Sequence, residues 1–179
     1  MKHILILVLL AVVSCKEAPK ENVVLNHPKE EMGETQEIVN PELTIYNFNE
    51  LEPLLHKTGD KIYVVNFWAT WCGPCVKELP YFEELPTTYG DKDVEVLLVS
   101  LDFVNQYETK LKPFIREHEI QSEVIALNDP DANTWIPKVN ADWSGSIPAT
   151  IIYTKDKREF FEQSFTYEAL EHAIKQFIN

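Results

Sequence analysis

One segment limits what this chain can fold into more than any other: two cysteines, Cys72 and Cys75, between an apolar run and a helical pattern. The apolar run covers 62–68 and is nearly continuous, as expected of a central strand buried on both faces. After the cysteines, apolar residues recur at three- and four-residue spacing as far as about Tyr89, as on one face of a helix. This order predicts an α/β protein with its cysteine pair at the start of a helix.

The rest of the chain from about residue 41 continues to alternate strand and helix patterns, without an internal repeat. The resulting order predicts an α/β sandwich with a central mixed β-sheet flanked by helices. The predicted strands cover 43–46, 62–68, 94–100, 124–127, 149–153 and 159–161, and the predicted helices cover 47–56, 76–89, 106–118, 131–139 and 167–178.

The charge of the chain argues against one class of partner. Among its 179 residues, 29 are acidic and 16 are basic, which gives a formal net charge of −13 at pH 7. Such a chain repels a phosphate backbone, and no compact stretch of Lys and Arg would overcome that repulsion. We therefore expect no nucleic-acid partner.

The first fifteen residues have the pattern of an export signal. Lys2 comes before ten consecutive apolar residues, 4–13, which are far fewer than the ~20 that a membrane-spanning helix needs. The run ends at Ser14 and Cys15, and this ending resembles the lipobox of bacterial lipoproteins. The resemblance implies that residues 1–14 are a signal peptide and that Cys15 then carries a lipid. A plain signal peptide with an incidental cysteine and an uncleaved anchor are the alternatives.

Residues 15–40 are rich in Lys, Glu, Pro and Asn, and they show neither helical nor strand periodicity. We expect a flexible, lipidated tether there, and about 25 such residues have an r.m.s. span of roughly 25–30 Å. The folded domain should then cover 41–179. Because Cys15 accounts for the odd cysteine, Cys72 and Cys75 are left as the one redox couple.

The segment Cys72-Gly73-Pro74-Cys75 has the arrangement that thiol–disulfide exchange requires. At a helix start, free N–H groups and the helix dipole favour the thiolate of the first cysteine. Cys72 is therefore expected to attack a partner's disulfide, and Cys75, one turn further on, is expected to resolve the mixed disulfide. Gly73 and Pro74 keep the two sulfurs close, and a proline costs little so near a helix start.

Two alternatives for this pair are weaker. A zinc site would need two further ligands at workable spacing, but the sequence has no second such pair and its histidines are scattered singly. A purely structural disulfide that closes so small a loop would add little stability. Redox chemistry is the better interpretation, and we expect no metal and no cofactor other than a redox-active Cys72–Cys75 disulfide.

The sequence VVNFWATWCGPCVKELP, at 64–80, resembles the signature of the thioredoxin superfamily. More narrowly, it resembles the extracytoplasmic TlpA/ResA-like thiol-disulfide oxidoreductases. The likeness spans about 41–179 and is strongest at 62–86 and 146–150. It implies a thioredoxin-like fold, and the long segment between 102 and 145 is similar to insertions of the TlpA-like branch. Within that segment Trp143 either shapes substrate access or packs in the core.

The resemblance also implies a set of substrate-binding residues. Pro148, preceded by Ile147, matches the proline of the family that follows a cis peptide bond and holds an extended substrate segment beside the cysteines. Trp71 is expected to line the contact surface, together with Gly73 and Pro74 of the motif. An ordinary trans turn proline at 148 is the alternative.

One position departs from the cytoplasmic thioredoxins. They place a buried Asp six residues before the first cysteine, where this chain has Asn66, which cannot ionise. Glu78, three residues after Cys75, matches the active-site Glu of the ResA-like branch. A partly buried carboxylate there would have a raised pKa and could accept the proton of Cys75. A solvated helix glutamate is the alternative.

Together these features predict a membrane-tethered thiol-disulfide oxidoreductase in the bacterial cell envelope, facing the periplasm. The expected partners are the thiols and disulfides of exported proteins, an upstream membrane thiol-disulfide electron donor, and the membrane through the lipid. The residues leave the direction of electron flow open, whereas the resemblance implies reduction, with cytochrome c maturation as one family role. A thiol peroxidase of the same fold and a module that delivers copper through its thiolates are the alternative functions.

Overall fold

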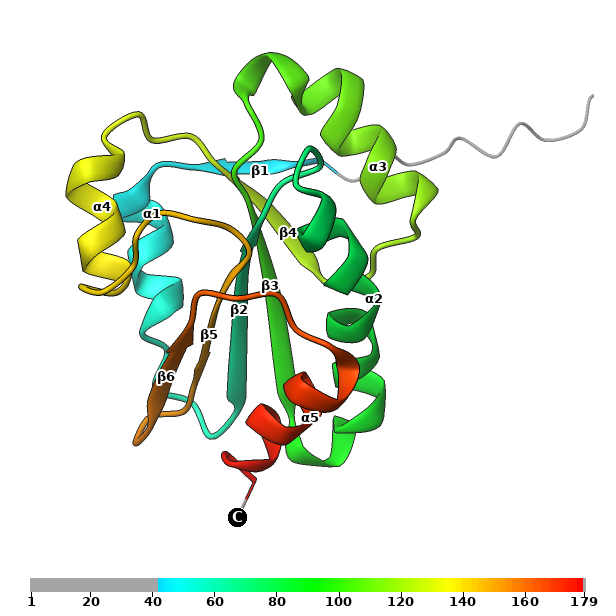
Figure 1. Cartoon of the computed structure of the whole chain (residues 1–179), viewed down its shortest axis with the longest axis vertical. Coiled ribbons are helices and arrows are strands. Elements are labelled where there is room, and N and C mark those ends of the chain that lie inside the picture. Colours follow the sequence, from blue (N-terminus) through cyan, green and yellow to red (C-terminus); the bar gives the residue numbers. More distant parts are fainter. Residues whose placement is uncertain (1–41, 179) are drawn as a thin grey trace, which may run out of the picture. The chain divides into compact units, whose positions relative to one another are not determined.

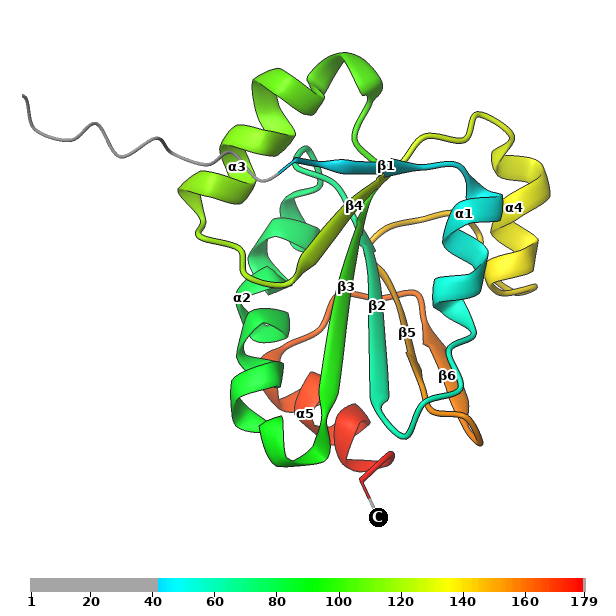
Figure 2. The same ribbon diagram turned by 180° about the vertical axis from the view of Figure 1, so that it is seen from behind.

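A mixed β-sheet forms the centre of the computed structural model, which describes residues 42–178 (Figures 1 and 2). Its strands are β1 (Thr44–Tyr46), β2 (Ile62–Trp68), β3 (Val94–Ser100), β4 (Glu123–Leu127), β5 (Ala149–Tyr153) and β6 (Arg158–Phe161). They lie in the order β1-β4-β3-β2-β5-β6 across the sheet. Neighbours from β1 to β2 are parallel, whereas β5 is antiparallel to both β2 and β6. The predicted mixed sheet is confirmed.

Helices cover both faces of this sheet, which confirms the predicted α/β class. The helical segments are α1 (Phe48–Leu51), η1 (Glu52–Leu55), α2 (Gly73–Thr88), η2 (Gly90–Lys92), η3 (Val104–Gln106), η4 (Tyr107–Leu111), α3 (Lys112–Glu117), α4 (Ala132–Val139) and α5 (Tyr167–Lys175). Side chains of α2, α3 and α5 share one core with the sheet, and those of α1 and α4 share the other.

The central strand β2 joins the two cores. All seven of its residues are buried, and their side chains alternate between the two faces of the sheet. Val64 and Trp68 pack beneath α2 and α5, whereas Val65 and Phe67 pack beneath α1 and α4. A strand covered on both faces needs apolar residues at consecutive positions, which explains the continuous run in the sequence. Asn66 also points to the α2 side, where it belongs to the candidate site.

The predicted helix at 106–118 consists of three segments with different winding. η3 is a 3₁₀ turn, η4 is a π-helical turn, and only α3 is α-helical. Pro113 has no N–H to donate to the preceding turn, so the α-helical ladder cannot run through it. The N–H of Lys112 instead reaches the carbonyl of Tyr107, five residues back. The spacing of apolar residues predicts the helical segment but not this change of winding.

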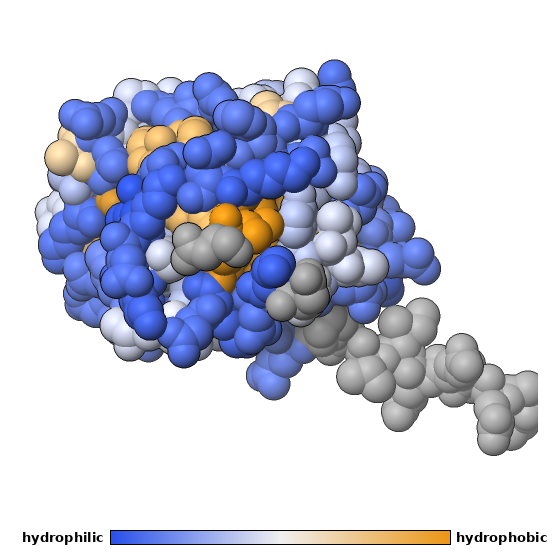
Figure 3. Space-filling view, turned by 90° about the horizontal axis from the view of Figure 1, so that it is seen from below, coloured by the Kyte–Doolittle hydropathy of each residue, from blue (hydrophilic) through white to orange (hydrophobic). Residues whose placement is uncertain are grey.

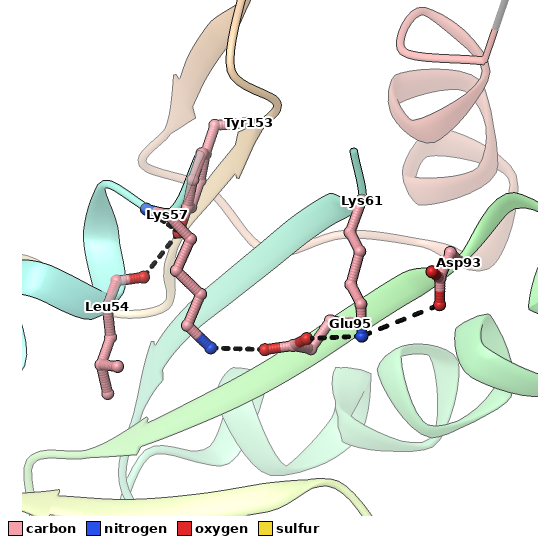
Figure 4. A network of polar contacts seen from close by, with 6 residues as sticks. All are labelled: Leu54, Lys57, Lys61, Asp93, Glu95 and Tyr153. Carbon is pink, nitrogen blue, oxygen red and sulfur yellow. Dashed lines mark hydrogen bonds and ion pairs between the residues drawn. The ribbon is translucent and has the colours of Figure 1, made fainter. Parts of the chain in front are cut away.

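A network of polar contacts lies at the end of the sheet away from the cysteines and connects it to the segment before β2 (Figure 4). Glu95, on β3, accepts from the ammonium groups of Lys57 at 2.5 Å and Lys61 at 3.1 Å. The hydroxyl of Tyr153 on β5 donates to the carbonyl of Leu54 at 2.6 Å. These contacts hold the segment before β2 against β3 and β5.

A hollow of about 490 Å³ opens at the same end of the molecule. Charged residues such as Asp60 and Lys155 line it together with the apolar Ile62, Phe177 and Ile178. In Figure 3 this end shows apolar surface surrounded by hydrophilic residues. Neither Cys72 nor Cys75 borders the hollow.

The predictions for the N-terminus fall on residues that the structure does not describe. The signal peptide (1–14), the lipidated Cys15 and the tether (15–40) lie outside the described residues. Between residues 42 and 178, no helix is both long enough and apolar enough to cross a membrane. The proposed anchor therefore stays a prediction from the sequence.

Candidate active site

The two cysteines form a disulfide where the chain leaves β2 and enters α2. Their Cα atoms are 5.3 Å apart. Cys72 takes the N-cap position of the helix, and its sulfur accepts the N–H of Cys75 at 3.3 Å. Cys75 is fully buried, whereas Cys72 keeps 6% of its surface exposed and has the exposed Gly73 and Pro74 directly after it. Of the two residues, Cys72 is therefore the better candidate for contact with a partner.

The loop before β5 comes to the same place. The peptide bond between Ile147 and Pro148 is cis. The carbonyl oxygen of Ile147 lies 3.8 Å from the sulfur of Cys72. Ile147 is half-buried and Pro148 is buried, so a partner approaching Cys72 meets mainly the backbone of the loop and the Ile147 side chain.

Glu78 is completely buried on α2, three residues after Cys75. Its carboxylate accepts from the side-chain amide of Asn66 at 3.0 Å and from the backbone N–H of Phe165 at 2.7 Å. Burial raises the pKa of Glu78, while the hydrogen bonds from Phe165, Asn66 and Ser164 oppose that rise. The alternative of a solvated helix glutamate is wrong, because no part of this side chain meets solvent.

Asn66 connects Glu78 to the strand that follows the cis proline. Its side-chain N–H₂ group donates to Glu78 at 3.0 Å and to the hydroxyl of Thr150, on β5, also at 3.0 Å. Among residues 42–178, no group is placed to donate to the side-chain oxygen of Asn66. Since Asn66 stays neutral, any change of charge in this buried cluster must come from Glu78.

Trp71 stands beside Cys72 with 51% of its surface exposed. Phe103, which is 62% exposed, stacks on it with the ring centroids 6.1 Å apart. Val104 is also exposed, so an apolar surface borders the disulfide. Trp71 was predicted from the sequence but Phe103 was not, because only the fold brings the loop after β3 next to the loop after β2.

Asp102 is a second residue that the sequence did not reveal. It is 3% exposed and accepts from the backbone N–H of Thr70 at 3.0 Å and from the Thr70 hydroxyl at 2.5 Å. The hydroxyl of Ser100 also donates to it, at 2.9 Å. Asp102 thus ties the loop that carries Cys72 to the end of β3. Its position two residues after the buried strand β3 is the signal in the sequence that could have pointed to it.

Trp143 packs in the core. It is 5% exposed and lies against Phe67, Trp135 and Phe160. Its indole N–H donates to the carbonyl of Ser146 at 2.8 Å, so it also supports the loop before the cis proline. Of the two alternatives stated for Trp143, core packing agrees with the structure.

In the part of the chain that the structure describes, no group of three or more His, Cys, Asp or Glu side chains is gathered as metal ligands would be. The two sulfurs are bonded to each other, and the carboxylate nearest along the helix, Glu78, is occupied by hydrogen bonds from Asn66 and Phe165. What the arrangement can do is exchange a disulfide: an outer sulfur, an inner sulfur one turn away, and a buried carboxyl group that can hold a proton.

Comparison with known proteins agrees with this geometry. Residues 41–158 match the AhpC/TSA family. A curated relative, thiol-disulfide oxidoreductase ResA of Bacillus cereus, is 33% identical over 93 residues, which are 51% of this chain and 48% of that protein. The chain therefore spans about half the length of this relative, and the similarity supports the TlpA/ResA-like assignment made from the signature.

Solved structures show the same fold. A DsbF homologue from Corynebacterium diphtheriae has a TM-score of 0.53 at 25% identity, over 70% of this chain and 75% of that one. An exposed lipoprotein thioredoxin of Streptococcus pneumoniae has a TM-score of 0.51 at 22% identity, over 68% of this chain and 89% of that one. With its thioredoxin-like fold and the matched segment that includes both cysteines, the chain belongs to the AhpC/TSA family.

Proposed function

We propose that this protein is a thiol-disulfide oxidoreductase that reduces disulfides of other proteins. The observation that carries the proposal is the Cys72–Cys75 disulfide at the start of α2, with Cys72 the less buried of the two residues and the cis-proline loop beside its sulfur. The name of the ResA relative supports this reaction class. So do the exposed Trp71 and Phe103, which offer apolar contact area next to the reacting sulfur.

The reaction starts from the reduced pair. The Cys72 thiolate attacks one sulfur of the partner's disulfide, and the other partner sulfur leaves as a thiolate that takes up a proton. The thiolate of Cys75 then attacks the Cys72 sulfur, which releases the second partner thiol and closes the Cys72–Cys75 disulfide. Two electrons pass from this protein to the partner. The electron donor is then a separate protein dithiol, which reduces the Cys72–Cys75 disulfide and so returns the pair to its starting state.

Glu78 accepts the proton that Cys75 loses before its attack. Its position on the same helix, its burial and its raised pKa support this role. A carboxyl group that is costly to ionise is a suitable proton acceptor at the moment when a buried thiol must lose its proton. The neutral Asn66 holds the carboxylate in place without adding charge.

Contact with the partner involves Trp71, Gly73 and Pro74 on one side of Cys72 and Ile147 and Pro148 on the other. The first three are exposed, and the loop carbonyl of Ile147 lies 3.8 Å from the Cys72 sulfur. A partner segment that runs between these two sides would bring its own cysteine to Cys72 in an extended conformation.

We further propose that the chain works outside the cytoplasm and is held at the membrane by a lipid on Cys15. The export pattern of residues 1–14 and the lipobox-like ending support this. The described fold also resembles that of an exposed lipoprotein thioredoxin. In that location the substrates are exported proteins, and cytochrome c maturation is one process that needs such a reductant.

Reduction of insulin disulfides, with dithiothreitol as electron source, tests the proposed reaction. The full-length chain should accelerate the reaction and Cys72→Ser should not. Reduced Cys75→Ser, mixed with insulin in the absence of dithiothreitol, should accumulate a mixed disulfide through Cys72. Equal rates for the wild type and Cys72→Ser would exclude the proposal. A parallel assay of hydrogen peroxide consumption distinguishes the alternative of a thiol peroxidase, which would consume peroxide and leave insulin intact.

A further inference from the structure

The turn before the cis proline is held from two sides. On one side, the indole N–H of Trp143 donates to the carbonyl of Ser146 at 2.8 Å. On the other side, the backbone N–H of Ser146 donates to the carboxylate of Glu162 at 3.1 Å. Both polar groups of the Ser146 backbone are therefore fixed, and the next residue along the chain is Ile147, whose carbonyl lies beside Cys72.

Glu162 comes directly after β6 and contacts this turn at more than one point. Besides Ser146, its carboxylate accepts from the backbone N–H of Ser144 at 3.2 Å and from the Ser144 hydroxyl. These hydrogen bonds, with that of the Ser144 hydroxyl the strongest, lower the pKa of Glu162. The carboxylate is thus ionised near neutral pH, where it only accepts hydrogen bonds.

The shape of the turn depends on a glycine between these two serines. Gly145 has a φ of +91°, a conformation that other residues rarely adopt. A Cβ atom at this position would also come within 3.1 Å of the Ile136 side chain. The turn is therefore specified by its glycine, by the Trp143 indole on one side and by the Glu162 carboxylate on the other.

The segment that carries Glu162 also reaches the buried carboxylate of the site. Three residues later, the backbone N–H of Phe165 donates to Glu78 at 2.7 Å. The short connection from β6 to α5 thus contacts the cis-proline loop at one end and Glu78 at the other. A residue in this connection can therefore help to fix the position of the cis-proline loop relative to Glu78.

We infer that Glu162 is a positioning residue that fixes the Ser146–Ile147 backbone for the binding of a partner polypeptide. The inference rests on the proposed function, because it assigns Glu162 a part in substrate binding at the same site. A loop held in its binding conformation before the partner arrives lowers the ordering cost of binding. Glu162 does not touch the sulfurs, so it acts on binding rather than on the chemistry of Cys72.

The test compares three variants of the full-length chain: Glu162→Ala, Glu162→Gln and the control Glu159→Ala. Glu159 lies on β6 and pairs with Lys157 at 2.8 Å, away from the turn. For Glu162→Ala we expect KM for a peptide disulfide to rise about five- to tenfold with kcat unchanged, as for the loss of a few hydrogen bonds to a charged acceptor. Glu162→Gln, which keeps one acceptor oxygen, should fall between wild type and alanine, and Glu159→Ala should match the wild type.

Hydrogen exchange gives a readout that does not depend on activity. The amide protons of Ser144 and Ser146 should exchange about five- to tenfold faster in Glu162→Ala, because both lose the Glu162 carboxylate and Ser146 keeps only the longer contact with the Ser144 hydroxyl at 3.4 Å. Wild-type KM and wild-type exchange in this variant would overturn the inference, and so would an equal rise of KM in Glu159→Ala. If the wild type reduces no disulfide, the proposed function fails, while slow exchange at Ser146 that requires Glu162 would still support the positioning of the turn.

Discussion

Phe165 donates its backbone N–H to the carboxylate of Glu78 at 2.7 Å, in a place that no solvent reaches. The two residues are 87 positions apart in the chain, and their contact joins the active-site helix to the segment before α5. It gives the buried carboxylate a backbone partner that carries no charge. Two predictions depend on Glu78, one about the rate of exchange and one about stability.

Replacing Glu78 by Gln should slow the release of a mixed disulfide by about tenfold to a hundredfold at neutral pH, because Cys75 would lose the proton acceptor that we propose for it. The fold should persist, since the amide oxygen of Gln can still accept from Phe165 and Asn66 can turn its free oxygen toward the new N–H₂ group. Stopped-flow measurement of mixed-disulfide release measures the rate. Glu84→Gln, an exposed site on the same helix, is the control, and equal kinetics in Glu78→Gln and wild type would reject the proton-acceptor role.

The pH dependence of stability should also reveal Glu78. Its pKa is raised in the folded chain, mainly by burial, from an ordinary value of 4.5. Between these two pKa values the folded protein keeps a proton that the unfolded chain has released. The contribution to stability is therefore fully present below pH 4.5 and is lost as the pH rises through the folded pKa. Urea unfolding of the oxidised protein from pH 4 upward should show this loss in the wild type, and a parallel curve for Glu78→Gln would contradict it.

Asp102 should matter for stability because its removal leaves buried donors without a partner. Asp102→Ala deprives the Thr70 backbone N–H and the Ser100 hydroxyl of their acceptor, which should lower the free energy of unfolding by about 1–3 kcal/mol. Asp102→Asn keeps one oxygen and should lose less. Urea denaturation of both, combined with Thr70→Val in a double-mutant cycle, isolates the contact between the two residues. Additive losses would show that the Thr70 hydroxyl contributes nothing through Asp102.

The aromatic pair beside the disulfide should affect partner binding and leave stability nearly unchanged. Phe103→Ala removes a side chain that is 62% exposed, so the free energy of unfolding should change by less than about 0.5 kcal/mol. KM for a protein disulfide should rise about threefold to tenfold, as expected for loss of an aromatic contact. A small substrate such as oxidised glutathione should be reduced as before. Ile45→Ala, an exposed apolar site on β1, is the control, and an unchanged KM in Phe103→Ala would remove this residue from the contact surface.

The sequence was sufficient for those parts of the fold that depend on local patterns. The continuous run of β2 predicts a strand covered on both faces, and the cysteine spacing predicts the start of α2. Contacts between segments that are distant in the sequence could not be predicted from these local patterns. Phe103 meets Trp71, and Glu162 meets Ser146, only because β3 and β5 both lie next to β2 while β6 borders β5. Nothing in the local sequence states which strands are neighbours.

The pairing of β2 with β5 fixes the geometry of the site through a single register. Phe67, near the end of β2, lies opposite Ala149, the first residue of β5, and the two strands run in opposite directions. The cysteines, which follow β2, and Pro148, which precedes β5, therefore lie at the same end of these two strands. A slip of this ladder by one residue would move the cis proline along the strand by about 3.3 Å. It would also turn Thr150 away from Asn66, so the Cys72 sulfur and the loop before Pro148 are kept in place by the backbone hydrogen bonds of this ladder.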